Sequence, residues 1–351
     1  MRIHLVGLGL IGSSIGAGLR QAGHEVSGED LDERRALRAR QLGVIDEIGG
    51  RERAELCFVC TPAASVVESA RALLSPPQQD SLVVTDVASV KRQIATELAH
   101  PRFVAGHPMA GSEQEGPDGA APDLFVGATW VLTPGPETTE AAFSVVKGAV
   151  SELGAEVVVL PPERHDELVA VVSHVPHLTA ATLMGLAASS PVDREALLRL
   201  AAGGFRDMTR IAAGSASIWP DICADNKEAI LETLDRLQSE LSRVRQIVWA
   251  EDREELSSLL ESARAARRNL PARGSQPVES RELRVLVPDR PGVLAEVTAV
   301  AARLGVNIYD IEIAHSAEGT RGVLVLSLAS EPLERLAEAL RGAGFQVSSS
   351  T

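Results

Sequence analysis

The sequence predicts an α/β protein in three parts: a doubly wound sheet, an all-helical domain and a small βαββαβ domain. Strand and helix patterns alternate over residues 1–160, helical spacing alone continues to about residue 270, and a second alternating pattern starts at residue 282. The expected domains are therefore 1–160, 161–270 and 282–351, with a Pro- and Gly-containing linker at 271–281. A chain of 351 residues with 45% hydrophobic content is long enough to bury these cores.

The first part opens with a nucleotide-binding signature. The apolar run Ile3–Val6 predicts a buried strand and leads into Gly7-Leu8-Gly9-Leu10-Ile11-Gly12, which fits the GxGxxG pattern. In this pattern the first glycine permits a tight turn, the second lets the backbone approach a pyrophosphate, and the third lets the helix pack on the strand. A helical pattern and a second strand follow, as in a Rossmann-type fold. We expect cofactor contacts from Gly7, Gly9, Leu10, Ile11, Gly12, Asp30, Thr61 and Pro62.

Asp30 indicates which cofactor binds. It follows the strand at Glu25–Ser27, at about the ~20-residue offset where an acidic residue binds the ribose hydroxyls. A carboxylate at this place repels a 2′-phosphate, so NAD is favoured over NADP, although Arg34 and Arg35 lie close in sequence. The alternative role of Asp30 is to cap the next helix.

The remaining strands of the first part predict where a ligand binds. In a doubly wound sheet the ligand lies beyond the carboxyl ends of the strands, where Thr61-Pro62, Asp86–Ser89 and Gly106-His107 are expected as loops that face one crevice. The strands are expected at Leu56–Cys60, Leu82–Thr85, Phe103–Ala105, Thr129–Leu132 and Val157–Leu160.

Charge and hydropathy exclude several classes of protein. The formal net charge of −14 argues against a nucleic-acid surface. No stretch approaches the ~20 apolar residues that span a bilayer. The uncharged run Leu5–Leu19 resembles the core of a signal peptide, but that interpretation would discard the glycine loop and the first strand. We expect a soluble, cytoplasmic protein without membrane partners.

The three cysteines predict a reducing compartment. Cys57 and Cys60 form a CxxC pattern within an expected strand, where residues i and i+3 point to opposite faces. A metal or redox role for this pair is therefore not expected.

The helical part predicts an association surface. Residues 163–270 are rich in Ala, Leu, Glu and Arg, and apolar residues recur at helical spacing. Apolar faces of this kind pack against each other or against a second subunit, so we expect a homodimer. The clearest stripe comprises Ile230, Leu234, Leu237, Leu241 and Val244.

The tail, residues 282–351, resembles the ACT domain, a small module that commonly binds amino acids at a dimer interface. The resemblance rests on the βαββαβ pattern, on the loop Asp289-Arg290-Pro291-Gly292 and on the phrase Gly305–Ile311. It implies a regulatory site that includes Asp289, Pro291, Gly292 and Asn307; the alternative is a domain that only dimerises.

The chain as a whole resembles the prephenate dehydrogenase family, of the type with a C-terminal ACT domain. Besides the glycine loop, the resemblance rests on Thr85–Lys91 (TDVASVK), Phe103–Gly116 (FVAGHPMAGSEQEG), Ser173–His177 (SHVPH), Gly203–Ala212 (GGFRDMTRIA) and Trp219–Ile222. It implies oxidative decarboxylation, in which a hydride leaves ring C4 of prephenate for the nicotinamide and the ring carboxylate leaves as CO2, so that 4-hydroxyphenylpyruvate forms.

The resemblance also implies roles for individual residues. His107 matches the histidine that accepts the proton of the C4 hydroxyl, a task that suits neutral imidazole near pH 7. Ser89 matches the serine that hydrogen-bonds and orients this histidine. Arg210 matches the arginine that pairs with the ring carboxylate, for which a planar guanidinium gives bidentate geometry. The remaining substrate positions are His177, Ser112 and Gly203, and a network at the pocket mouth comprises Glu113, Arg206 and Asp207.

Several alternatives stay open at this point. The substrate is prephenate or its transaminated analogue arogenate, and tyrosine is a possible inhibitor that acts through the ACT domain. A zinc site at His165, His174 and His177 lacks an evident fourth ligand. A β-hydroxyacid dehydrogenase would use a lysine in the helical part, for which Lys227 is the candidate, and an amino-acid sensor without catalysis would have lost its site residues.

Overall fold

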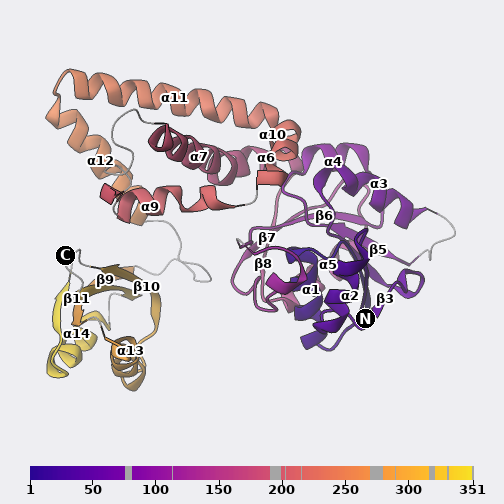
Figure 1. The fold of residues 1–351 in the computed structure, drawn as a ribbon, viewed down its shortest axis with the longest axis horizontal. Coiled ribbons are helices and arrows are strands. Elements are labelled where there is room, and N and C mark those ends of the chain that lie inside the picture. Colours follow the sequence, from indigo (N-terminus) through magenta and orange to yellow (C-terminus); the bar gives the residue numbers. More distant parts are fainter. Residues whose placement is uncertain are drawn as a thin grey trace. The chain divides into compact units, whose positions relative to one another are not determined.

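A computed structural model of the chain describes residues 1–75, 81–112, 114–189, 199–201, 203–214, 216–268, 280–288, 290–315, 321–329 and 332–349. It divides into two compact units, residues 1–256 and 257–351, and helix α12 (Arg253–Arg268) crosses the division (Figure 1). The expected linker 271–281 lies outside the described residues except for Ser280 and Arg281, which already belong to a strand.

The first unit contains an eight-stranded sheet in the order β3-β2-β1-β4-β5-β6-β7-β8. All neighbouring strands are parallel except β6 and β7, and the strand order reverses between β1 and β4, where a doubly wound sheet places its ligand. The predicted doubly wound fold is therefore confirmed. The strands are β1 (Arg2–Val6), β2 (Glu25–Glu29), β3 (Glu47–Ile48), β4 (Leu56–Val59), β5 (Val83–Asp86), β6 (Phe103–Pro108), β7 (Thr129–Thr133) and β8 (Glu156–Val159). The two-residue strand β3 has no counterpart in the prediction.

Helices cover both faces of the sheet, which is why its strands are apolar on both sides. One face packs α1 (Leu10–Gln21), α2 (Glu33–Gln41) and α5 (Glu140–Glu152), and the other packs α3 (Ala63–Leu74) and α4 (Arg92–Glu97) (Figure 1). Cys57 is buried with the second group, whereas Cys60 packs against the first. The two thiols therefore point to opposite faces, as the period of a strand predicts.

Strand β6 runs further than expected. Gly106 and His107 were predicted in a loop, but they lie within the strand, where His107 is paired with Val131 of the antiparallel neighbour β7. The pairing with β5 covers only two residues of β6, so it is β7 that extends the strand to Pro108. A Cβ atom at Gly106 would lie 2.9 Å from Nε1 of Trp130, so the close packing here requires glycine.

After the sheet, the first unit continues with a helical part. This part begins with a continuous helix, Pro162–Ala188. It comprises α6 (Pro162–Val169), a π-helical turn η3 (Ala170–His174) and α7 (Val175–Ala188). Pro176 lacks an N–H group and cannot continue an α-helical ladder, and the π turn ends two residues before it, at His174. The following elements are α9 (Gly203–Thr209), the short turns η4 (Arg210–Ala213) and η5 (Ala216–Ile218), α10 (Trp219–Asp225) and α11 (Lys227–Trp249).

The helix Pro162–Ala188 is long and apolar enough, by length and composition alone, to count as a candidate membrane span. Polar residues such as His174 and His177 interrupt this helix, so it does not present the ~20 consecutive apolar residues that the sequence was expected to lack. Its buried residues include His165, Asp166 and His174, two of which bond directly to the nucleotide-binding half. Exposed apolar side chains such as Val172 and Leu186 leave a face of the kind that a second subunit covers.

The second unit has the predicted βαββαβ pattern, which is thereby confirmed. Its sheet has the order β10-β11-β9-β12, and all neighbouring strands are antiparallel. Apolar residues of α13 and α14 pack with those of the sheet in one core. The elements are β9 (Ser280–Pro288), α13 (Val293–Arg303), β10 (Ile308–His315), β11 (Arg321–Ala329), α14 (Leu333–Gly342) and β12 (Gln346–Ser349).

Candidate active site

The glycine loop has the geometry that a pyrophosphate needs. Gly7 has φ +97°, and a Cβ atom there would lie 2.6 Å from the carbonyl oxygen of Cys60. Helix α1 begins directly after Gly9, which gives it no side-chain cap and leaves open space at its own Cα. The first N–H groups of this helix, those of Leu10, Ile11 and Gly12, are thus available to an anion.

Asp30 is held against the glycine loop by a backbone hydrogen bond. One oxygen of its carboxylate accepts the backbone N–H of Leu8 in the glycine loop at 2.8 Å, and the other accepts the N–H of Asp32 at 2.8 Å. The cap of helix α2 is Asp32, whose side chain accepts the N–H of Arg34 at 3.0 Å. Asp30 is therefore not the cap of this helix.

Thr61 adds a further polar group at this edge of the sheet. It follows β4, with the exposed Pro62 beside it, and its hydroxyl oxygen is buried without a hydrogen-bond partner among the described residues. An orphaned buried hydroxyl of this kind is costly unless a ligand satisfies it. The free hydroxyl, the open glycine and the uncapped helix together fit a bound dinucleotide.

Asp86 and Lys91 form a buried ion pair at the end of β5. Both side chains are fully buried, and the ammonium group of Lys91 donates to one carboxylate oxygen of Asp86. The same carboxylate accepts the N–H of Ala88 at 2.9 Å and that of Gly106 at 3.1 Å. Burial lowers the pKa of Lys91, while Asp86 acts in the opposite direction. The pair therefore secures the loop 87–91 against β6.

His107 lies next to this ion pair and is only 7% exposed. Its Nδ1 is 2.8 Å from Nε2 of His165, whose Nδ1 is 2.7 Å from Oδ1 of Asp166. Burial, with the nearby His165, Lys91 and His174, lowers the pKa of His107 well below its ordinary value. The imidazole is therefore neutral near pH 7 and has the form that accepts a proton.

The partner of His107 differs from the one that the family resemblance implies. Ser89 was expected to orient this histidine, but the neighbour bonded at Nδ1 is His165, and Ser89 makes no hydrogen bond within the described part of the chain. Sequence reasoning named His165 only as a candidate zinc ligand. Its partner is 58 residues away, so no local spacing reveals the contact.

Asp166 joins the two halves of the site. Its Oδ1 accepts the backbone N–H of Lys91 at 2.8 Å, and its Oδ2 accepts that of Arg92 at 2.9 Å, at the start of α4. Its own carbonyl accepts the side-chain amide of Asn226 at 2.8 Å, and this amide also lies 3.2 Å from Nδ1 of His174. The buried Asn226 thus connects α10 and α11 to the same cluster.

Trp219 lies between two further histidines. Its ring stacks on His177 with centroids 3.8 Å apart and meets the edge of His174 at 6.1 Å. Burial lowers the pKa of His174 to about 4, and it also lowers the pKa of His177. A Cβ atom at Gly214 would lie 3.7 Å from Cε1 of His177, so the turn that begins at Arg210 ends beside this histidine.

The remaining substrate candidates are exposed. Arg210 begins the turn η4, Gly203 begins α9, and Ser112 follows β6 with its hydroxyl accepting the N–H of Gln114 at 3.2 Å. Arg206 donates to the carbonyl of Ala201 at 3.1 Å. The predicted network at the pocket mouth stays a prediction, because Glu113 lies outside the described residues and Asp207 is exposed.

The alternatives from the sequence find no support in the geometry. Lys227 is exposed, whereas the adjacent Asn226 is the buried residue that joins the cluster. Within the described ranges no group of three or more His, Cys, Asp or Glu side chains is arranged to hold a metal ion.

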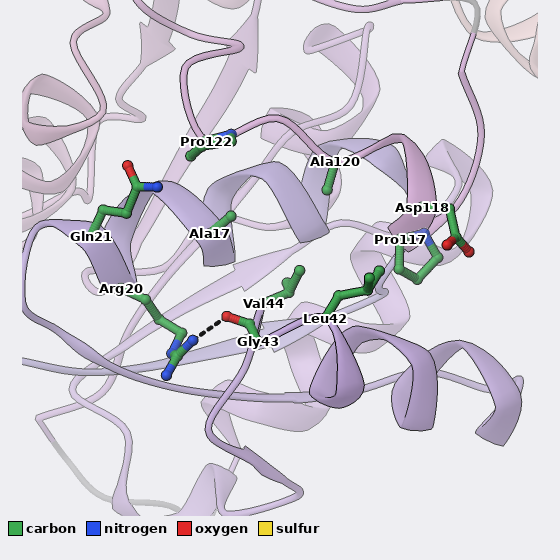
Figure 2. A pocket seen from close by; sticks show the side chains of 10 residues that line it. All are labelled: Ala17, Arg20, Gln21, Leu42, Gly43, Val44, Pro117, Asp118, Ala120 and Pro122. Carbon is green, nitrogen blue, oxygen red and sulfur yellow. Dashed lines mark hydrogen bonds between the residues drawn. The ribbon is translucent and has the colours of Figure 1, made fainter.

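A cavity of about 470 Å³ lies apart from these residues, between α1, the residues after α2 and the turn at Pro117 (Figure 2). The guanidinium of Arg20 on its rim already donates to the carbonyl of Gly43 and pairs with Asp46. Arg20 is therefore already paired and is not available to an anionic ligand of this cavity. The histidine cluster lies elsewhere.

The proposed regulatory loop of the second unit is described in part. Gly292 has φ +88° and precedes α13 without a side-chain cap, and Pro291 and Asn307 are exposed. Asp289 lies outside the described residues.

These features place the chain among the NAD-dependent oxidoreductases with a Rossmann-type nucleotide domain. Family models give the particular group: the nucleotide-binding domain of prephenate dehydrogenase matches residues 15–159, its dimerization domain matches 161–262, and the ACT domain matches 281–345. The chain belongs to the prephenate dehydrogenase family.

Individual relatives agree with this assignment. A prephenate dehydrogenase of Bacillus subtilis is 36% identical over 349 residues, which covers 96% of this chain and 94% of the relative. Among solved structures, prephenate dehydrogenase from A. aeolicus in complex with hydroxyphenyl propionate and NAD+ has a TM-score of 0.71 at 30% identity, covering 76% of this chain and 97% of that one. Synechocystis arogenate dehydrogenase has a TM-score of 0.66 at 30% identity, covering 76% and 99%.

Proposed function

We propose that this protein is a cytoplasmic, homodimeric prephenate dehydrogenase that converts prephenate to 4-hydroxyphenylpyruvate in tyrosine biosynthesis. The observation that carries the proposal is His107, a buried neutral histidine held next to the nucleotide-binding edge of the sheet. Relatives that match the chain over nearly its whole length support the substrate, and the match to a dimerization domain supports the homodimer. Three free cysteines fit a reducing compartment.

The chain's own residues perform the binding and the proton transfer. Bound NAD would accept the hydride from ring C4. His107 takes the proton of the C4 hydroxyl as the carbonyl develops, and the ring carboxylate then leaves as CO2. The electron pair of the broken bond makes the ring aromatic and places a negative charge on the oxygen at C4, which takes the proton back from His107. The reaction therefore consumes no net proton.

The substrate's two carboxylates require donors in the pocket. We assign the ring carboxylate to Arg210 and a further substrate contact to His177, whose positions beside one turn support this pairing. Ser112 and Gly203 complete the pocket, and Glu113, Arg206 and Asp207 form its mouth. Glycine-loop residues Gly7 to Gly12, with Asp30, Thr61 and Pro62, hold the cofactor.

Arogenate is the second candidate substrate, because a solved arogenate dehydrogenase is similar over 76% of the chain. The two substrates differ only in a keto group against an ammonium group on the side chain. The test is NADH formation by the purified protein with each substrate in parallel. A higher kcat/KM for prephenate is expected, and a higher value for arogenate would reverse the assignment.

For the ACT domain we propose regulation by tyrosine, the amino acid to which the reaction leads. The support is the glycine-led N-terminus of α13, where backbone N–H groups beside Gly292 can bind a carboxylate. We place Asp289, Pro291 and Asn307 at the same site.

A further inference from the structure

A chain of hydrogen bonds runs from His107 into the interior of the protein. It joins Nδ1 of His107 to Nε2 of His165 at 2.8 Å and Nδ1 of His165 to Oδ1 of Asp166 at 2.7 Å. The three residues are 7%, 0% and 1% exposed. In such a buried chain each nitrogen must be either a donor or an acceptor, because no water is available to make up for a mismatch.

The direction of every bond follows from Asp166. Its two carboxylate oxygens accept the backbone N–H groups of Lys91 and Arg92, which can only donate, so Asp166 is the fixed acceptor at the end of the chain. His165 must therefore carry its proton on Nδ1. A neutral imidazole has one N–H group, so Nε2 of His165 is an acceptor.

The same reasoning fixes His107. Because Nε2 of His165 accepts, Nδ1 of His107 donates, and the proton of His107 resides on Nδ1. The lone pair of His107 is then on Nε2, the nitrogen that is free to face a substrate. Without the acceptor at Nδ1, the imidazole could adopt the other tautomer, in which Nε2 carries a proton and cannot act as a base.

We propose that His165, held by Asp166, is a positioning residue that fixes the tautomer of His107 and stabilises the imidazolium formed when His107 accepts a proton. This inference rests on the proposed function. The new positive charge on His107 converts its bond to His165 into a charge-assisted one, and the Asp166 carboxylate lies one ring further away. The other ionisable groups at His107 are the Lys91–Asp86 pair, which is neutral as a pair, and His174.

Two substitutions at residue 165 separate this role from a packing role. His165→Leu removes the acceptor and keeps a side chain of similar volume. His165→Gln keeps a carbonyl oxygen near the position of Nε2 and an amide donor. For His165→Leu we expect kcat with prephenate to fall about 10²-fold, with both KM values unchanged within about twofold. We expect His165→Gln to recover at least tenfold of that loss.

The pH profile gives a second readout. The acid limb of kcat/KM should move in His165→Leu, because the imidazolium of His107 loses its acceptor, and should return toward the wild-type position in His165→Gln. Wild-type kcat in His165→Leu, or an equal loss in both variants, overturns the proposal. Thermal unfolding of each variant shows whether the fold is kept.

Nitrogen-15 NMR of the wild-type protein with labelled histidine reads the tautomer directly. At pH 7.5 both His107 and His165 should give the signals of the Nδ1–H form, with assignment by the loss of a signal in His107→Asn and in His165→Gln. An Nε2–H signal for His107 overturns the proposal. Because this measurement needs no substrate, it remains decisive even if prephenate is not turned over and the proposed function fails.

Discussion

Trp219 and His177 are stacked, with ring centroids 3.8 Å apart and an interplanar angle of 19°. The stack covers one face of the imidazole and leaves the ring edge for polar contacts. A Cβ atom at Gly214 would lie 3.7 Å from Cε1 of the same imidazole, so the turn that starts at Arg210 ends beside it. The histidine and the turn that carries the arginine, 33 positions apart in the sequence, thereby lie close together.

Replacement of His107 tests the catalytic base. His107→Asn should lower kcat by roughly 10²–10⁴ with little change in KM, because proton acceptance is lost only in the transition state. Steady-state kinetics with NADH detection measures this, and His100→Asn, at a half-buried histidine before β6 and outside the histidine cluster, serves as the control. Turnover at the wild-type rate would remove His107 from the mechanism.

Replacement of Arg210 tests the anchoring of the substrate carboxylate. Arg210→Gln removes a charge-assisted contact worth on the order of 1.5–3 kcal/mol and should raise KM for prephenate by roughly 10- to 100-fold. Arg236→Gln, at an exposed position of α11, is the matched control. If kcat fell while KM stayed constant, Arg210 would not be a ground-state anchor.

Asp30 should determine the cofactor preference. Asp30→Ser removes the repulsion of a 2′-phosphate while Arg34 and Arg35 remain available, so kcat/KM for NADP should rise relative to that for NAD. Asp32→Ala removes the cap of α2 and should leave the NAD/NADP ratio unchanged. Equal ratios for Asp30→Ser and the wild type would assign the ribose to another residue.

The buried His174 should make stability depend on pH. Its pKa is about 4 in the folded protein and near 6.5 when unfolded, so the unfolded state binds more protons between these values. The free energy of unfolding should therefore fall as pH decreases from 6.5 to 4, by roughly 3 kcal/mol from this residue. Urea unfolding at several pH values measures the slope, which should be smaller in His174→Gln. An unchanged slope would contradict the assignment.

Tyrosine should inhibit through the ACT domain with a coupling free energy of typically 1–3 kcal/mol. Since coupling in binding is reciprocal, prephenate should weaken tyrosine binding by the same factor, which calorimetry with and without prephenate can measure. A chain that ends at Ser275 should be active and insensitive to tyrosine, and Asn307→Ala in the full chain should be less sensitive. Undiminished inhibition of the shortened enzyme would place the inhibitor in the catalytic pocket.

The sequence was sufficient to predict features with local signals. The glycine loop, Asp30 and the βαββαβ tail each depend on short spacings, and the structure has the predicted folds around them. The extension of β6 through His107 was missed because it depends on pairing with β7, more than 20 residues later. His165 and Asp166 were missed for the same reason, since their partners are 58, 75 and 74 residues away. Asp86 and Lys91 both lie in the motif Thr85–Lys91, but the sequence could not show that their side chains are buried and form an ion pair.

The attachment of Asp166 to the amides of Lys91 and Arg92 has a mechanical meaning. These amides belong to the nucleotide-binding half, whereas Asp166 lies in α6, the first helix of the helical half. The two bonds therefore connect the two halves. A movement that pulled α6 away from α4 would have to break both bonds and would also shift the adjacent His165. We therefore expect His165 to support His107 only while these two bonds are intact.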